Sequence, residues 1–94
     1  MGEKSGRAAN LLNAHLANPF LVLDLPVATP ADMVERKGEL LLSLLAAGVV
    51  DATSYHSPFG PRERTPEMVR EALAELRDPD RRLVHEWWIR NEVS

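Results

Sequence analysis

Three histidines are the first residues to consider, because imidazole binds metal ions and exchanges protons near neutral pH. His15, His56 and His85 lie on three separate segments, and no spacing such as His-x-x-x-His or His-Glu-x-x-His occurs. A carboxylate such as Asp51 or Glu86 would have to complete a metal site. The chain has no cysteine, which excludes thiolate ligands and disulfides. We therefore predict no metal site.

Residues 54–57 (Ser-Tyr-His-Ser) place hydroxyl groups beside an imidazole. Neighbours in sequence rarely form a nucleophile–base pair, and no glycine elbow or oxyanion motif accompanies them. The sequence therefore predicts neither an enzyme nor a bound cofactor. Two interpretations of this segment stay open. Either Tyr55 and Phe59 anchor an ordered loop on the core, or they form an aromatic tip that contacts a partner.

Arginines are concentrated in the last third of the chain, where they are matched by acidic residues. Residues 62–94 hold seven arginines and eight carboxylates, and the whole chain has a net charge of −3. Many of these charges pair at helical spacing, such as Asp78 with Arg82. We expect the Arg82 side chain to bond to a helix end or to Asp78. A self-neutralising helix face of this kind predicts no nucleic-acid and no membrane partner.

The composition predicts one small helical domain. The 94 residues include 25 leucines and alanines but nine valines and isoleucines, which favours helices over strands. The longest apolar stretch, residues 40–50, is well short of the roughly twenty residues that span a bilayer. Residues 1–7 are polar and are not followed by the apolar run of a signal peptide. We therefore expect a cytoplasmic protein.

Four capping residues, each followed by a proline, mark helix starts: Asn18-Pro19, Thr29-Pro30, Thr65-Pro66 and Asp78-Pro79. They predict helices over 19–24, 30–47, 66–77 and 79–90. Gly48 ends the second of these, and residues 48–65 are predicted to be a long loop. Residues 1–17 are predicted to be an N-terminal extension that is partly helical, because apolar residues recur at helical spacing over 7–17.

Two segments carry large apolar side chains on more than one side. The second half of the 30–47 helix is apolar almost all round. Either the loop and the first helix cover it, or part of it awaits a partner. Trp87 and Trp88 point about 100° apart on a helix, so they cannot both face the same core. One is expected to pack under the 48–65 loop or against the 66–77 helix. The other is expected either to reach the first helix or to be exposed, as an interface anchor is.

Residues 18–45 and 72–88 together resemble a J-domain, the co-chaperone module that activates DnaK-type chaperones. The first segment is similar to the aromatic and aliphatic turn that leads into the second J-domain helix. The second segment matches the Asp-Pro-x-x-Arg pattern through Ala72, Leu76, Asp78, Pro79 and Arg82. The resemblance implies a single all-α, J-domain-like bundle over 18–94. Helices 30–47 and 66–77 would form its central antiparallel pair, with short flanking helices.

The chain departs from J-domains where their activity resides. The His-Pro-Asp tripeptide is absent, and Leu45, Ala46 and Ala47 stand in its place. The second helix of a J-domain is basic, whereas residues 30–47 hold three acidic and two basic residues. The expected function is therefore a non-catalytic protein–protein interaction or assembly module. Its expected partner is another protein, with a second copy of the chain among the candidates.

The predicted contact surface combines one helix end, the loop aromatics and the tryptophans: Leu41, Leu42, Leu45, Tyr55, Phe59, Trp87 and Trp88. Two alternative functions stay open. One is a co-chaperone of a DnaK-type protein that acts through a non-standard surface. The other is a small nucleic-acid-binding domain.

Overall fold

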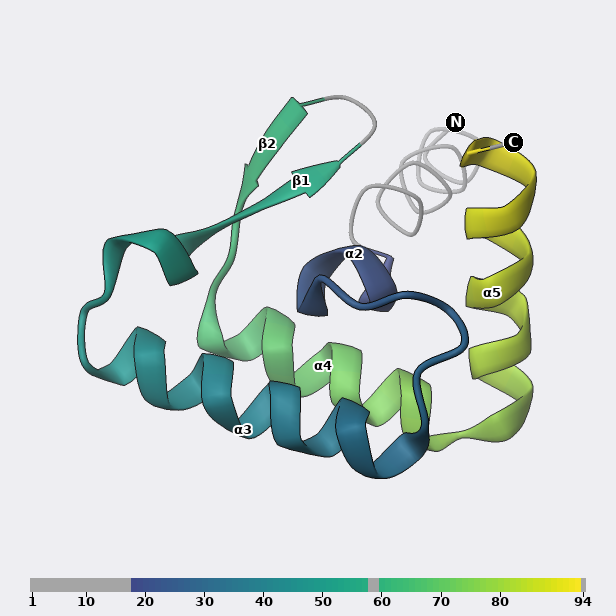
Figure 1. The fold of residues 1–94 in the computed structure, drawn as a ribbon, viewed down its shortest axis with the longest axis horizontal. Helices are drawn as coiled ribbons and strands as arrows, with labels where there is room; N and C mark the ends of the chain where they lie inside the picture. The colour runs from purple at the N-terminus through teal and green to yellow at the C-terminus, as the bar shows by residue number, and fades with distance from the viewer. Residues whose placement is uncertain (1–17, 58–59, 94) are drawn as a thin grey trace, which may run out of the picture.

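The computed structural model describes residues 18–57 and 60–93, which are mainly helical and include one small hairpin (Figure 1). In chain order the elements are α2 (Pro19–Leu23), α3 (Ala31–Ala46), the 3-10 helix η1 (Val50–Thr53), β1 (Ser54–Ser57), β2 (Gly60–Glu63), α4 (Pro66–Arg77) and α5 (Pro79–Val93). All four helices predicted within this part are present. The helix expected over 7–17 lies outside the described residues.

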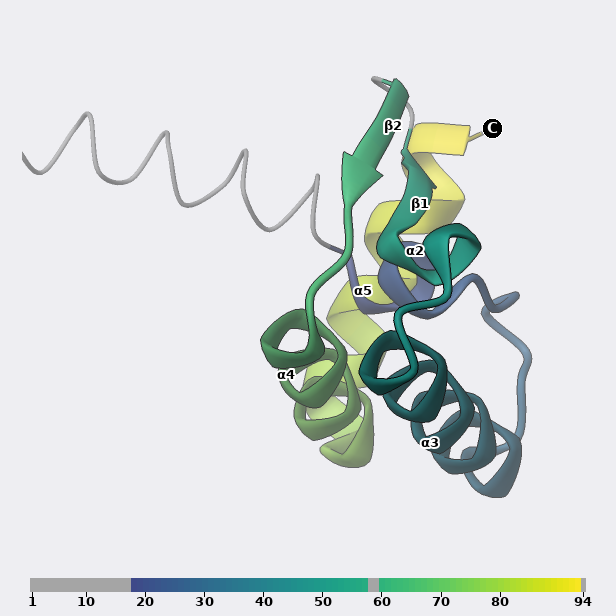
Figure 2. The ribbon, with the colours of Figure 1, turned by 90° about the vertical axis from the view of Figure 1, so that its left-hand side faces the viewer.

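Helices α3 and α4 lie side by side and run in opposite directions (Figures 1 and 2). The predicted antiparallel pair is therefore confirmed. Helix α2 packs mainly against α4 and the hairpin, and α5 stands steeply across the end of the pair (Figure 1). The chain thus places α5 at one end of the molecule and the connection from α3 to η1 at the other.

Three of the four predicted helix caps are confirmed. The Asn18 side-chain oxygen accepts a hydrogen bond from the Phe20 amide at 3.0 Å. The Thr65 hydroxyl accepts one from the Met68 amide at 3.2 Å. Asp78 Oδ1 accepts one from the Asp80 amide at 3.0 Å. Each cap satisfies an amide that has no partner within the first turn of its helix.

The fourth cap, at Thr29, was wrongly predicted. Helix α3 begins at Ala31, and Pro30 holds the cap position without a side-chain hydrogen bond. The Thr29 hydroxyl instead donates to the Pro26 carbonyl at 2.7 Å, and the Thr29 amide bonds to the same oxygen. The Thr29 side chain is thus directed at the preceding turn, and no amide of the first turn of α3 donates to it.

The core lies between α2 and the α3–α4 pair. Its largest fully buried side chains include Phe20 and Leu23 from α2 and Val69 from α4. Gly38 of α3 is buried against Leu73, and a Cβ built on Gly38 would lie 2.5 Å from both Leu73 methyl carbons. The two long helices therefore approach closely because residue 38 has no side chain.

The prediction of a loop over 48–65 was wrong, because this segment contains η1 and the β1–β2 hairpin. The strands are antiparallel, with Ser54 opposite Glu63 and Ser57 opposite Gly60. Tyr55 is buried while its neighbours on β1 are exposed or half-buried, which is the alternation of a strand packed on one face. Each strand has four residues, too few for the alternation to stand out in the sequence.

Candidate interaction surface

The seven residues predicted to contact a partner do not form one exposed surface. Leu41 and Tyr55 are buried in the core, and Leu42 and Leu45 are half-buried and pack against it. Burial of Tyr55 agrees with the interpretation in which it anchors its segment on the core. Phe59 lies outside the described residues.

The apolar second half of α3 is covered from several sides. Helices α2 and α4 and the 3-10 helix η1 all contact α3. The positions of α3 that face this cover recur at helical spacing: Val34, Gly38, Leu41 and Leu45. At these positions, the apolar surface of α3 is therefore covered by the rest of the chain and does not await a partner.

The two tryptophans differ in exposure. Trp87 is 56% exposed, whereas Trp88 is half-buried. Their rings meet edge to face, with centroids 5.2 Å apart and planes at 83°. The Trp87 ring is therefore braced by its neighbour while it stands in solvent.

Leu83 and Val84 share the exposed side of α5 with Trp87. These two side chains are 63% and 54% exposed. On the opposite side of α5, Arg82 and His85 make polar contacts with the body, and Ile89 packs against the core. We call Leu83, Val84 and Trp87 the α5 face. Their spacing is the sequence signal that could have identified the first two as contact residues.

Polar contacts fix the orientation of α5. The Arg82 side chain donates to the carbonyls of Val27 and Thr29, in the loop before α3, and to Glu86 at 3.0 Å. It thus bonds neither to a helix end nor to the Asp78 carboxylate, contrary to the prediction. The Asn18 side chain donates to the His85 carbonyl at 3.1 Å. These contacts hold the opposite side of α5 against the body and leave the α5 face exposed.

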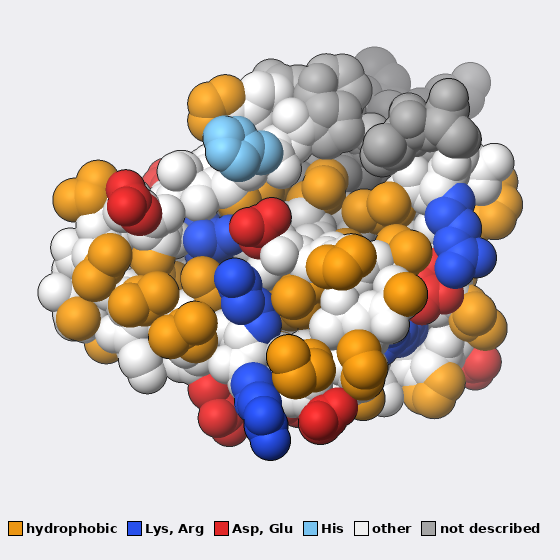
Figure 3. Space-filling model, in the orientation of Figure 1, with side chains coloured by type: hydrophobic (Ala, Val, Ile, Leu, Met, Phe, Trp, Pro, Cys, Tyr) orange, Lys and Arg blue, Asp and Glu red, His pale blue; other side chains and the backbone are white. Residues whose placement is uncertain are grey.

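A second exposed apolar region lies where α3 ends and η1 begins. Val50 is 77% exposed, and Val49 and Leu40 are also exposed. We call Leu40, Leu44, Ala47, Val49 and Val50 the α3 tip; Ala47 is exposed and Leu44 half-buried. Hydrophobic side chains gather over this end of the molecule in Figure 3. The sequence pattern correctly indicated an apolar end of α3. The residues predicted there, Leu41, Leu42 and Leu45, are however the ones that face the core.

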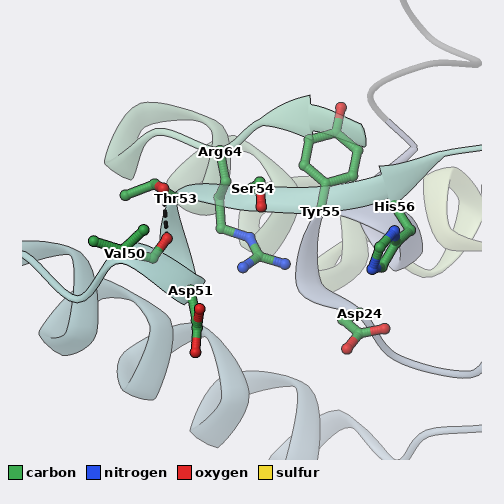
Figure 4. A pocket seen from close by; sticks show the side chains of 8 residues that line it. All are labelled: Asp24, Val50, Asp51, Thr53, Ser54, Tyr55, His56 and Arg64. Atoms are coloured by element: carbon green, nitrogen blue, oxygen red, sulfur yellow. Dashed lines mark hydrogen bonds between the residues drawn. The ribbon is translucent and has the colours of Figure 1, made fainter. Parts of the chain in front are cut away.

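A pocket of about 410 Å³ lies between the end of α2, η1 and β1 (Figure 4). The Arg64 guanidinium points into it, although the residue is only 5% exposed. Arg64 donates to the Val22 and Ala52 carbonyls at 2.7 and 3.1 Å, so it fastens α2 to η1. Burial lowers the pKa of Arg64, and the nearby Asp24 partly opposes this shift.

Charges of both signs line this pocket. Asp24 and Asp51 flank Arg64 (Figure 4), and neither carboxylate forms an ion pair with it within 4 Å. Ser54 and His56 also line the pocket. Burial raises the pKa of Tyr55, which keeps its hydroxyl protonated. No group of three metal-ligating side chains occurs within 18–57 and 60–93, and His15 falls outside these ranges.

Several arginines of the C-terminal third form ion pairs within and between the helices. Arg77 pairs with Glu35 across α3 and α4, and Arg82 pairs with Glu86. Asp78 pairs with Arg81 rather than with Arg82. The prediction that this region neutralises its own charge holds for Arg81 with Asp78 and for Arg82 with Glu86. Arg77 instead pairs with Glu35 outside the region, and the expected Asp78–Arg82 pair was wrong.

Glu75 joins α4 to α5 through two partners. Arg81 donates to its carboxylate at 2.6 Å, and His85 Nε2 lies 3.1 Å from the other carboxylate oxygen. The hydrogen bond from His85 is the largest cause that holds the pKa of Glu75 below its ordinary 4.5, and Arg81 adds to it. The Glu75 contact therefore weakens when the carboxylate takes up a proton.

We expect Glu75→Gln to lower the free energy of unfolding at neutral pH and to matter less in acid. A carboxyl whose pKa is depressed in the folded state adds stability above pH 4.5. This contribution is lost as the pH falls through the folded pKa. The side chain is one-third exposed, so the difference should be about 1 kcal/mol or less. Urea unfolding of both proteins at about pH 7 and about pH 3 measures it. An equal difference at both pH values would contradict the prediction.

No helix in the described part of the chain is both long and apolar enough to cross a bilayer. Comparison with protein-family models gave no match. Neither curated proteins nor solved structures gave a match either. The case for a function therefore rests on the surfaces described above.

Proposed function

We propose that the chain is a non-catalytic protein-interaction module whose contact surface is the α5 face. The observation that carries this proposal is the exposure of Trp87 between two other exposed apolar residues. Single apolar side chains on a surface are ordinary, whereas three neighbouring large ones favour a contact site. Tryptophan is among the residues that most often anchor protein interfaces.

The rigidity of the α5 face supports this role. The contacts that Arg82 and Asn18 make with the body fix the helix, and the Trp88 ring contacts that of Trp87. Little side-chain freedom is then lost when a partner covers the tryptophan, which lowers the entropic cost of association. The proposed mechanism is burial of apolar side chains against another protein.

We also propose that this module is built on a degenerate J-domain-like scaffold. The antiparallel pair α3–α4, with α2 and α5 packed beside it, supports this relationship. The hairpin occupies the connection in which a J-domain would present His-Pro-Asp. With that tripeptide absent, the favoured activity is binding and not stimulation of a chaperone ATPase.

Photo-crosslinking tests the proposed contact surface. We expect p-benzoyl-phenylalanine in place of Val84 to form adducts with a specific protein in the native host. Val84 is used because it leaves the Trp87 anchor in place. The same probe in place of Ala74, which is exposed on α4, should give no such adduct. Gel shifts followed by mass spectrometry identify the adducts.

The variant Trp87→Ser, combined with the probe at position 84, should remove most of the adduct. An exposed side chain contributes little to folding, so circular dichroism of this variant should match the parent. The proposal fails if positions 74 and 84 give the same adducts, or if position 84 gives none.

A further inference from the structure

We infer that the pocket between α2, η1 and β1 binds a small zwitterion of the amino-acid type. In this arrangement Arg64 holds the carboxylate of the ligand, and Asp24 and Asp51 hold its ammonium group (Figure 4). The inference is independent of the proposed function, because none of the residues that line the pocket belongs to α5.

The buried arginine of the pocket is the first support. Arg64 is only 5% exposed, so its charge is largely removed from water. Nε donates to the Val22 carbonyl and Nη1 to the Ala52 carbonyl, whereas no described residue accepts a hydrogen bond from Nη2. Asp24 acts on this charge, but no described carboxylate lies within 4 Å of it. A buried cation without a counter-ion in contact is costly, and the carboxylate of a ligand supplies one.

The two carboxylates beside Arg64 decide what else the ligand must carry. Asp24 and Asp51 line the pocket, and both residues are exposed. Neither forms an ion pair with a described residue. A simple anion that reaches Arg64 is repelled by these carboxylates, and a simple cation is repelled by Arg64. A zwitterion places its carboxylate at the guanidinium and its ammonium group at the aspartates, so it satisfies charges of both signs.

The backbone at Asp24 is consistent with a use for its carboxylate. Asp24 ends α2 in the left-handed conformation, with φ 56° and ψ 55°. Among the described residues it is the one residue other than glycine with a positive φ. Glycine fits such a helix end at lower cost, so the aspartate is present at the expense of some stability. Recognition of an ammonium group by the carboxylate accounts for this choice.

The size of the pocket and its apolar wall fit an amino acid with an apolar side chain. The volume of about 410 Å³ lies within the range of roughly 300–1,000 Å³ that is typical of small-molecule sites. Val50 lines the pocket and is 77% exposed, so a ligand side chain can remove apolar surface from water there. Because the aspartates are exposed, we expect weak binding, with a dissociation constant on the order of 1 mM.

Leucine and two analogues that each lack one charge test the inference. Isocaproate is leucine without the ammonium group, and isoamylamine is leucine without the carboxylate. Proton–nitrogen correlation NMR of the full chain measures the three affinities in parallel titrations. We expect leucine to shift the amide signals of Asp24 and Ser54 and the Nε signal of Arg64 in a saturable way. Each analogue should bind about tenfold more weakly than leucine, because one charged contact is missing.

Asp24→Asn is the decisive variant, because asparagine also tolerates the left-handed conformation but carries no charge. This variant should bind leucine about three- to tenfold more weakly than the wild type does. It should bind isocaproate no more weakly than before, because asparagine does not repel a carboxylate. A merely structural effect of the substitution would weaken both ligands alike. Asp32→Asn, at an exposed site in the first turn of α3, is the matched control and should leave leucine binding unchanged.

Several outcomes would overturn the inference. It is wrong if leucine gives no saturable shift up to its solubility limit. If isocaproate binds as tightly as leucine, the pocket selects anions, and if isoamylamine does so, it selects cations. If Asp24→Asn binds leucine like the wild type, the carboxylate takes no part in binding. None of these results changes the adducts expected from the probe at position 84, so the inference and the proposed function fail separately.

Discussion

Arg82→Ala should lower the free energy of unfolding by about 2–4 kcal/mol, because it removes a partly buried charge with several partners. The Arg82 side chain is 19% exposed and holds the loop before α3 against α5 through the Val27 and Thr29 carbonyls. Its loss also leaves Glu86, which is 16% exposed, as an unpaired carboxylate. Chemical denaturation of both proteins gives the difference.

The planar guanidinium is essential to this arrangement. It donates to Glu86 through Nε and to two carbonyls through Nη2, and it lies over the Phe20 ring at 5.4 Å from the centroid. A lysine ammonium is a single point charge and cannot reproduce this fork. Arg82→Lys should therefore recover only a small part of the loss. Removing the orphaned carboxylate as well, in Arg82→Ala with Glu86→Ala, should recover more.

Arg77→Ala is the matched control for Arg82→Ala. Arg77 also forms an ion pair with a glutamate, Glu35, but both side chains are well exposed. Exposed pairs contribute about 0–1 kcal/mol. If Arg77→Ala lowered the free energy of unfolding as much as Arg82→Ala does, burial and the carbonyl contacts would not be the cause of the loss at Arg82.

Gly38→Ala should destabilise the fold by about 1–3 kcal/mol through overpacking between α3 and α4. The new methyl carbon would lie 2.5 Å from both Leu73 methyl carbons and 2.8 Å from Leu73 Cγ. Leu73 is 4% exposed and surrounded by core residues, so it cannot swing aside freely. Alanine is a better helix former than glycine by about 1 kcal/mol, which offsets part of the cost. Thermal and urea unfolding measure the net effect.

A double-mutant cycle checks that Leu73 is the cause. Leu73→Ala opens a cavity that the Gly38→Ala methyl can partly fill, so the two changes together should cost less than their sum. Ser43→Ala, at an exposed site on the same helix, should change stability by less than about 0.5 kcal/mol. Additive losses at positions 38 and 73 would contradict the close-approach explanation.

Local signals in the sequence predict most of the helical framework. Asn18, Thr65 and Asp78 each combine a capping side chain with a following proline, and each begins a helix as expected. Thr29 carries the same signal but closes a turn onto Pro26. The difference depends on whether the chain before the threonine can fold back onto it, which the Thr-Pro pair alone does not specify.

The hairpin and the exposed surfaces depend on tertiary placement. Tyr55 becomes a strand residue because one face of β1 packs on the body, and four residues are too few to reveal this beforehand. On α3, the choice of Leu41 over Leu40 as the buried residue follows from the helical phase set by Gly38 and Leu73. The side of α3 that faces the core is set by the contact between Gly38 and Leu73, which are 35 positions apart in sequence. Local composition therefore does not determine it.

The polar attachment of α5 has a consequence for how the molecule opens. Among the α5 side chains that contact the body, Ile89 packs against the core, while Arg82 and His85 hold the helix by hydrogen bonds. A helix that buries little apolar surface opens at a lower free energy than a well-packed pair, so we expect α5 to detach from the body before α3 and α4 separate. Its amides then exchange with solvent before those of the core, and covering Trp87 slows that exchange. A partner that binds the α5 face therefore also stabilises the packing of α5 against the body, because it binds only when α5 is in place.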